Sequence, residues 1–118
     1  STIYYSRGNS KMALKDFEGA IYDFDKAIEI DPNYKSAYVN RGISKKNIKD
    51  FKGSIIDYEK VLSMNPNDAI TFHNLALSKK ELGDIKGACA DMKKSFSLGN
   101  SLASKFINLE CKVKSKAT

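Results

Sequence analysis

The triplet Asp31-Pro32-Asn33 returns 34 residues later as Asn65-Pro66-Asn67. The surrounding residues return in step with it, so the chain divides into three units, residues 1–34, 35–68 and 69–102. One aromatic and two small residues recur at fixed places in these units: Tyr4, Tyr38 and Phe72; Gly8, Gly42 and Ala76; Ala20, Ser54 and Ala88. A fixed period of this size is typical of stacked-repeat proteins, in which each unit completes its core with its neighbour.

Each unit has the apolar spacing of two helices. In the second unit, steps of three and four residues trace one face from Tyr38 to Ile48 and another from Phe51 to Leu62. Helix breaks within the units are predicted where an Asp can cap the next helix, at Lys15-Asp16, Lys49-Asp50 and Gly83-Asp84. Breaks between units are predicted at Pro32 and Pro66, because proline cannot continue a helix interior. The sequence therefore predicts an all-α stack of helical hairpins.

The residues at these recurring positions resemble the sequence pattern of the tetratricopeptide repeat (TPR) family. The units match it through Tyr4, Arg7-Gly8, Ala20, Phe24, Ala27 and Pro32, then Tyr38, Gly42, Ser54, Tyr58 and Pro66, then Phe72, Leu75-Ala76, Ala88 and Met92. The resemblance implies a right-handed α-solenoid forming one domain over residues 1–118. The chain departs from the pattern where Leu, Tyr and the third Pro are usual, with Arg7 and Arg41, with Lys11, Lys45 and Lys79, and with Asn100.

A seventh, capping helix is predicted over about residues 102–114. Phe106 and Leu109 stand in the places of Phe72 and Leu75, which extends the core into the cap. Lysines keep its other faces polar, as the end of a solenoid requires: Lys105, Lys112, Lys114 and Lys116. The chain starts at the first place of a repeat without Met, which indicates processing or a fragment of a longer array.

Charge and hydropathy favour a soluble domain, either cytoplasmic or exported. The net charge is +6, but residues 93–118 alone carry six lysines and one acidic residue. Since a basic end usually aids solubility, we do not expect binding to nucleic acid or to a membrane surface. No apolar run approaches the roughly 18 residues that a membrane span needs. We expect a monomer or a weak homo-oligomer.

In TPR arrays the first helix of each hairpin lines a concave groove, so the resemblance implies that a peptide or partner segment binds there. The predicted groove residues are Tyr5, Asn9, Val39, Asn40, Ile43, His73, Asn74, Leu77 and Asn108. Asn40, Asn74 and Asn108 follow one another at intervals of 34 residues. An asparagine amide offers an acceptor and two donors, which match a peptide backbone. The alternative is that these amides bond only neighbouring helices or water.

TPR domains that bind the C-terminal carboxylate of cytosolic chaperones resemble one another in a clamp of Lys and Asn, then Asn, then Lys and Arg. The matching places here hold Tyr5 and Asn9, then Asn40, then Ile70 and Asn74. Because the three cations are missing, a carboxylate would lose its charge-assisted hydrogen bonds. We therefore do not expect this chain to bind a chaperone tail.

Other recurring residues have structural interpretations. Arg7 and Arg41 recur with acidic residues on the second helices, Asp23, Asp57 and Asp91, which indicates ion pairs rather than an anion site. Glycines in the second helices are predicted to allow close approach of adjacent helices: Gly19, Gly53 and Gly87. Cys89 either is a buried small hydrophobe or pairs with Cys111 in a disulfide that holds the cap. We expect no metal site and no cofactor.

Catalysis has little support, because the single histidine, His73, has no base or nucleophile within reach on its own helix. We therefore predict a non-catalytic protein–protein interaction scaffold. The alternatives are a structural spacer or self-assembly module of a longer array and, with less support, a basic-ended contact to nucleic acid or membrane.

Overall fold

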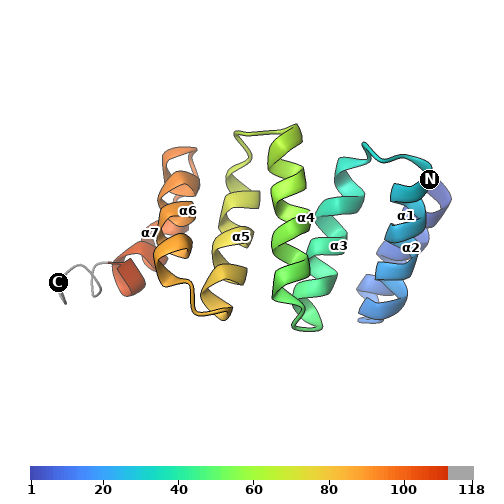
Figure 1. Cartoon of the computed structure of the whole chain (residues 1–118), viewed down its shortest axis with the longest axis horizontal. Coiled ribbons are helices and arrows are strands. Elements are labelled where there is room, and N and C mark those ends of the chain that lie inside the picture. The colour runs from blue at the N-terminus through green and yellow to red at the C-terminus, as the bar shows by residue number, and fades with distance from the viewer. Residues whose placement is uncertain (112–118) are drawn as a thin grey trace.

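The computed structural model describes residues 1–111 and contains helices but no strand in this range (Figure 1). The helices are α1 (Thr2–Ala13), α2 (Phe17–Ile30), α3 (Lys35–Asn47), α4 (Phe51–Met64), α5 (Ala69–Glu81), α6 (Ile85–Ser97) and α7 (Ala103–Phe106), followed by a π-helical segment, η1 (Ile107–Cys111). They form three hairpins, α1–α2, α3–α4 and α5–α6. The predicted all-α solenoid is confirmed.

The hairpins stand side by side along the long axis of a stack that measures 50 × 25 × 19 Å (Figure 1). The first helices α1, α3 and α5 are neighbours in one layer, and the second helix of each hairpin packs against the first helix of the next. Each hairpin therefore shares its core with the following one. The large side chains at the centre, Phe24, Tyr58 and Met92, are fully buried.

The breaks within the hairpins lie where the sequence predicts them. Lys15, Lys49 and Gly83 have positive φ angles of 64°, 66° and 86°, which end the first helices. The following residues, Asp16, Asp50 and Asp84, cap α2, α4 and α6. Each carboxylate accepts a hydrogen bond of 2.9–3.0 Å from the backbone N–H three residues later. Such a cap stabilises a helix by about 1 kcal/mol.

Those N–H donors belong to Gly19, Gly53 and Gly87. The prediction that these glycines bring helices together is wrong for Gly19 and Gly87, whereas a Cβ at Gly53 would also meet the Lys45 side chain of α3, at 2.9 Å. A Cβ at any of them would collide with the carboxylate of the capping Asp. Close approach between helices occurs instead at Gly8 and Gly42. A Cβ there would lie 2.6 Å from the ring of Phe24 or 2.7 Å from the ring of Tyr58.

The predicted ion pairs join the two helices of a hairpin. Arg7 donates from Nε and Nη2 to both carboxylate oxygens of Asp23, at 3.0 and 2.7 Å. Arg41 holds Asp57 in the same way, at 2.9 and 2.7 Å. These bonds from Arg7 lower the pKa of Asp23 despite its burial. Burial opposes the charge of Arg41, but its bonds to carboxylates outweigh that cost and raise its pKa.

The lysines that replace the usual tyrosines take part in the same pairs. Lys11 Nζ lies 3.1 Å from Asp23, and Lys45 Nζ lies 3.5 Å from Asp57. The third hairpin has Leu75 in place of the arginine, so within the described range Asp91 is paired with Lys79 alone, at 2.6 Å. The arginines and lysines that depart from the family pattern thus pair with acidic residues between the helices of each hairpin.

The cap differs from its prediction in register. Leu109 is 62% exposed, whereas Leu75 in the corresponding place is 3% exposed. The physical reason is the π-helical turn of η1, which rotates the segment relative to a continuous α-helix. Ala103, Phe106 and Ile107 pack instead against the core of the third hairpin. The predicted continuation to residue 114, with Lys112, Lys114 and Lys116, lies outside the described residues.

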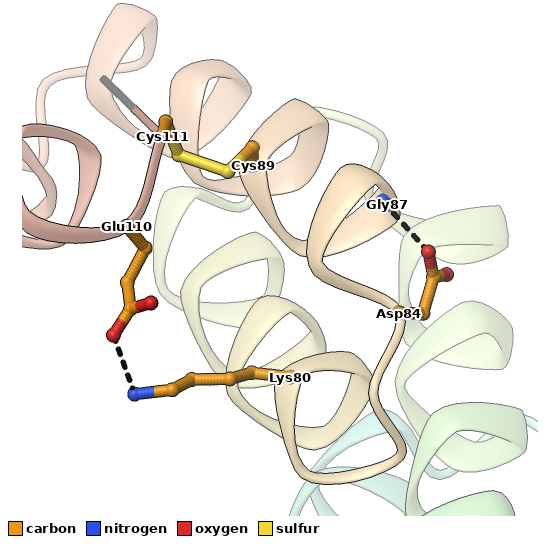
Figure 2. The surroundings of a disulfide bond; sticks show 6 residues. All are labelled: Lys80, Asp84, Gly87, Cys89, Glu110 and Cys111. Atoms are coloured by element: carbon orange, nitrogen blue, oxygen red, sulfur yellow. Dashed lines mark hydrogen bonds and ion pairs between the residues drawn. A yellow bond between two sulfur atoms is a disulfide. The ribbon is translucent and has the colours of Figure 1, made fainter. Parts of the chain in front are cut away.

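A disulfide between Cys89 and Cys111 joins η1 to α6, with the two Cα atoms 5.8 Å apart (Figure 2). Both cysteines are buried. Glu110, on the same segment, forms an ion pair with Lys80 on α5, with 2.9 Å between Nζ and the carboxylate oxygen. The cap is therefore attached to both helices of the third hairpin.

Candidate functional site

The predicted binding residues share one environment. Eight of them are half-buried on the three first helices: Tyr5, Asn9, Val39, Asn40, Ile43, His73, Asn74 and Leu77. We refer to these eight residues as the first-helix surface. The ninth, Asn108, is exposed on η1. Half-burial holds each side chain in place while leaving part of it accessible to a ligand.

Asn40 connects two helices of this surface. Its Nδ2 donates to Asn9 Oδ1 at 2.7 Å and to the hydroxyl of Tyr5 at 3.2 Å, both on α1. The two amide hydrogens are therefore used within the protein. The carbonyl oxygen Oδ1 of Asn40 accepts no hydrogen bond from a residue in the described range, so it remains an acceptor for a ligand N–H.

Tyr5 has a core role that the sequence did not indicate. Its ring lies 4.9 Å from the ring of Tyr34 and 5.9 Å from that of Phe24, measured between centroids. This aromatic cluster fixes the hydroxyl beside Asn40. The available signal was Tyr34 itself, since the corresponding places in the other units hold Asp68 and Leu102.

Asn74 differs from Asn40 in its hydrogen bonding. Its amide makes no hydrogen bond to another side chain or carbonyl within residues 1–111, although the residue is half-buried on α5. Both its donors and its acceptor are therefore available, as a peptide backbone would require.

A chain of hydrogen bonds orients His73. Ser95 Oγ donates to the carbonyl oxygen of Ala69 at 2.7 Å, so it accepts from Asn100 Nδ2 at 2.9 Å. The same Nδ2 lies 3.0 Å from His73 Nδ1. Because an amide nitrogen only donates, Nδ1 is the acceptor and the ring hydrogen is on Nε2. His73 is thus a hydrogen-bond donor through Nε2.

The charge state of His73 agrees with this arrangement. Burial, together with the positive charge of Lys46, lowers the pKa of His73 from its usual value. The ring is therefore neutral at pH 7.

Asn100, which stands where the other units have proline, is the residue that sequence reasoning missed. The departure itself was visible in the sequence, but its contact with His73 depends on the fold.

Two lysines stand at the same place in their units beside this surface. Lys46 on α3 makes no ion pair within the described part of the chain, whereas Lys80 on α5 is paired with Glu110. Lys80 also lies over the ring of Phe106, 5.6 Å from its centroid. The surface therefore combines apolar side chains, amide groups and one unpaired cation, which is chemistry suited to recognition.

Residues 1–111 contain neither a membrane-spanning helix nor a metal-binding cluster. None of the helices there combines the length and hydropathy needed to cross a membrane. Nor does this part of the chain bring together three or more side chains able to hold a metal ion.

Two models of the tetratricopeptide repeat match the sequence, over residues 1–34 and residues 36–68. Together they cover more than half of the chain. The chain belongs to the tetratricopeptide repeat family. TPR domains are protein–protein interaction modules, and the TPR fold is in general a non-enzymatic scaffold.

Solved TPR structures superpose closely on this TPR chain. The first TPR of Spaghetti (RPAP3), bound to an HSP90 peptide, has a TM-score of 0.89 at 16% identity, over 97% of this chain and 92% of that one. The TPR domain of Sgt2 from Aspergillus fumigatus has a TM-score of 0.86 at 21% identity, over 98% and 80%. At these identities the likeness concerns the fold.

MamA from Desulfovibrio magneticus RS-1 has a TM-score of 0.78 at 26% identity, over 81% of this chain and 54% of MamA. This TPR chain therefore spans about half the length of the MamA chain that it matches.

Proposed function

We propose that this TPR domain binds an extended peptide or partner segment along its first-helix surface and has no catalytic activity. The observation that carries the proposal is the hydrogen-bonding state of two amides, one partly engaged and one free within the described residues. Asn40 is held by Asn9 and Tyr5 with its carbonyl free. Asn74, on the next first helix, has an amide that no described residue engages. Two such groups on neighbouring helices can bond successive peptide units of a ligand.

Hydrogen bonds alone would not hold such a ligand. Each contributes about 0.5–1.5 kcal/mol net, whereas micromolar binding needs about 8 kcal/mol. The half-buried apolar side chains of Val39, Ile43 and Leu77 lie on the same helices and supply the remaining contact area. The ligand therefore presents apolar side chains alternating with backbone groups, as an extended peptide does.

The charges favour an acidic or neutral ligand. Lys46 has no ion-pair partner in the described range, and the Nε2–H of His73 is a donor. Both groups suit a carboxylate or a carbonyl oxygen. The Spaghetti structure contains an HSP90 peptide. Here, Tyr5 and the 61% exposed Ile70 stand where the clamp lysines would, so we propose that the ligand is not a chaperone tail.

A peptide library displayed on phage tests the proposal. Selected peptides are measured by fluorescence anisotropy against the wild type, N74A and N40A/N74A. We expect binding about tenfold weaker for N74A and weaker still for the double variant, because each loses groups that bond the peptide backbone. N33A/N67A is the matched control, since these exposed asparagines are also 34 residues apart but lie in turns. Peptides that bind all four proteins equally would refute the proposal.

A further inference from the structure

The lysines in the last turns of the first helices differ in their pairing. Four of them make ion pairs with acidic residues: Lys11, Lys45, Lys79 and Lys80. The fifth, Lys46, makes none within residues 1–111, although it is half-buried on α3. Partial burial makes an unpaired charge costly. Lys46 is therefore a cation to which a ligand can supply the missing anion.

The packing of the first helices brings Lys46 toward His73. Asn40 on α3 donates a hydrogen bond of 2.7 Å to Asn9 on α1. The same step from α3 to α5, which are also in contact, places the residue after His73 beside Ile43. Lys46 follows Ile43 by about one helical turn, and its side chain leans back toward the N-terminus of α3. It therefore extends toward His73.

Electrostatics agree with this proximity. Besides burial, the positive charge of Lys46 lowers the pKa of His73, and such an effect weakens with distance. His73 uses Nδ1 to accept from Asn100 at 3.0 Å, which leaves Nε2–H as its donor. A cation and a neutral donor thus lie near each other, and neither is bonded to an acidic residue of the described range.

This combination selects a carboxylate. Lys46 and His73 can each donate to one of the two carboxylate oxygens, and charge-assisted hydrogen bonds are roughly twice as strong as neutral ones. One cation balances the single charge of a carboxylate, whereas a phosphate group carries nearly two charges at pH 7. The pair is also distinct from the chaperone clamp, whose places in the third repeat hold Ile70 and Asn74.

We propose that Lys46 and His73 form a subsite for an acidic side chain of the bound peptide. This inference rests on the proposed function and names the ligand chemistry at one point of the first-helix surface. One carboxylate oxygen accepts from Lys46 Nζ and the other from His73 Nε2. The peptide continues past the subsite toward Asn40 and toward Leu77, so the carboxylate belongs to an aspartate or glutamate side chain. Asn100 is a positioning residue, because its donor keeps the ring hydrogen on Nε2.

The peptides selected on phage test the subsite. They are synthesised with amidated C-termini, and each aspartate or glutamate is replaced in turn by asparagine or glutamine. We expect one replacement to weaken binding at least tenfold to the wild type but less than twofold to K46Q, which has already lost the ion pair. K52Q is the matched control, because it removes the same charge at an exposed place on α4 and should keep the tenfold loss. Equal losses with the wild type and K46Q would overturn the proposal.

Nitrogen NMR of His73, the only histidine, tests the positioning role of Asn100. At pH 8.5 we expect the wild-type ring to carry its hydrogen on Nε2. In N100D the new carboxylate accepts a hydrogen bond from Nδ1, so the population protonated on Nδ1 should rise. A wild-type ring protonated on Nδ1 would overturn the proposal, because its Nε2 has no hydrogen to donate.

A small probe separates this inference from the proposed function. It is an acetylated and amidated tripeptide with glutamate between two alanines, titrated to millimolar concentration. We expect a saturable NMR shift of His73 Nε2 that the same tripeptide with glutamine does not produce. Selected peptides that bind without an acidic residue would overturn the inference and leave the proposed function in place. A library without binders would refute the proposed function, and equal shifts from the two tripeptides would then overturn the subsite as well.

Discussion

The buried hydroxyls of Ser54 and Ser78 share a hydrogen bond of 2.8 Å between α4 and α5. One repeat earlier, the corresponding residues are Ala20 and Ser44, and Ser44 Oγ is buried with no hydrogen-bond partner in the described range. The interface between successive hairpins therefore has this hydrogen bond between α4 and α5 and lacks it between α2 and α3. An unpaired buried hydroxyl costs about 1–3 kcal/mol.

Substituting Ala20 by Ser should stabilise the protein. A20S supplies a partner for Ser44, so we expect the free energy of unfolding to rise by about 1 kcal/mol in urea denaturation. S44A should be neutral or stabilising, because it removes the unpaired group. S78A should destabilise by about 1–2 kcal/mol, because it leaves Ser54 with one bond fewer. Equal losses for S44A and S78A would contradict this account.

Replacing Tyr58 by Phe should be neutral or stabilising. The Tyr58 hydroxyl is buried without a partner in residues 1–111, and burial raises the pKa of the group. Phe24 occupies the same place one repeat earlier, so the ring alone fits. We expect a gain of up to about 1 kcal/mol in the free energy of unfolding.

Tyr38 is the control for that measurement. Its hydroxyl donates to the carbonyl oxygen of Pro32 at 2.9 Å, so Y38F should lose about 1 kcal/mol. A larger loss for Y58F than for Y38F would show that the Tyr58 hydroxyl has a partner after all.

The free energy of unfolding should decrease as the pH is lowered, because of His73. Its pKa is lowered in the folded protein, so the unfolded chain binds more protons as the solution is acidified. The stabilisation that neutral His73 contributes is fully present above about pH 6.5, the usual pKa of histidine. It is lost as the pH falls through the lower pKa that His73 has in the folded protein. Protonated Nδ1 would face the Asn100 donor. Urea denaturation at pH 7.5, 6.5 and 5.5 measures the decline.

His73 is the only histidine in the chain, so this effect has a simple control. H73Q should remove most of the pH dependence between pH 7.5 and 5.5. Asp23 does not titrate in this range, because its pKa is lowered from the ordinary Asp value. An unchanged slope in H73Q would assign the decline to other groups.

Reducing the disulfide should release the cap. Cys89 and Cys111 are 22 residues apart in the sequence, and a loop of this size corresponds to about 3 kcal/mol of stabilisation. We expect dithiothreitol, or C89S/C111S, to lower the free energy of unfolding by about that amount. Hydrogen exchange should accelerate in α7 and η1 but not in α1 and α2. Uniform acceleration along the chain would contradict this prediction.

The sequence predicted the helix breaks well because their signals are local. Asp16, Asp50 and Asp84 are good caps, and the 34-residue period repeats each signal. The same locality explains the error at Gly19. In the sequence, a glycine that contacts another helix cannot be told from one that contacts the cap of its own helix. The only distinguishing signal was that Gly19 follows Asp16 by three residues. Leu109 was misplaced because periodicity assumes a continuous α-helix and does not reveal a π-helical turn.

The candidate surface could be predicted only in part. The places of Asn40 and Asn74 followed from the period, but the state of each amide did not. Asn40 is bonded because Asn9 and Tyr5 lie beside it on another helix, and such a contact depends on how the hairpins stack. Asn74 has the same residue type at the same place but different neighbours.

The hydrogen bonds that run from Ala69 through Ser95 and Asn100 to His73 occur only in the third hairpin. The corresponding places hold Val61, Pro66 and Val39 in the second, and none of those side chains can donate or accept such a bond. The hairpins are therefore not interchangeable parts. A protein engineer who replaced the third hairpin with a copy of the second would preserve the helical scaffold and lose the titratable donor of the first-helix surface.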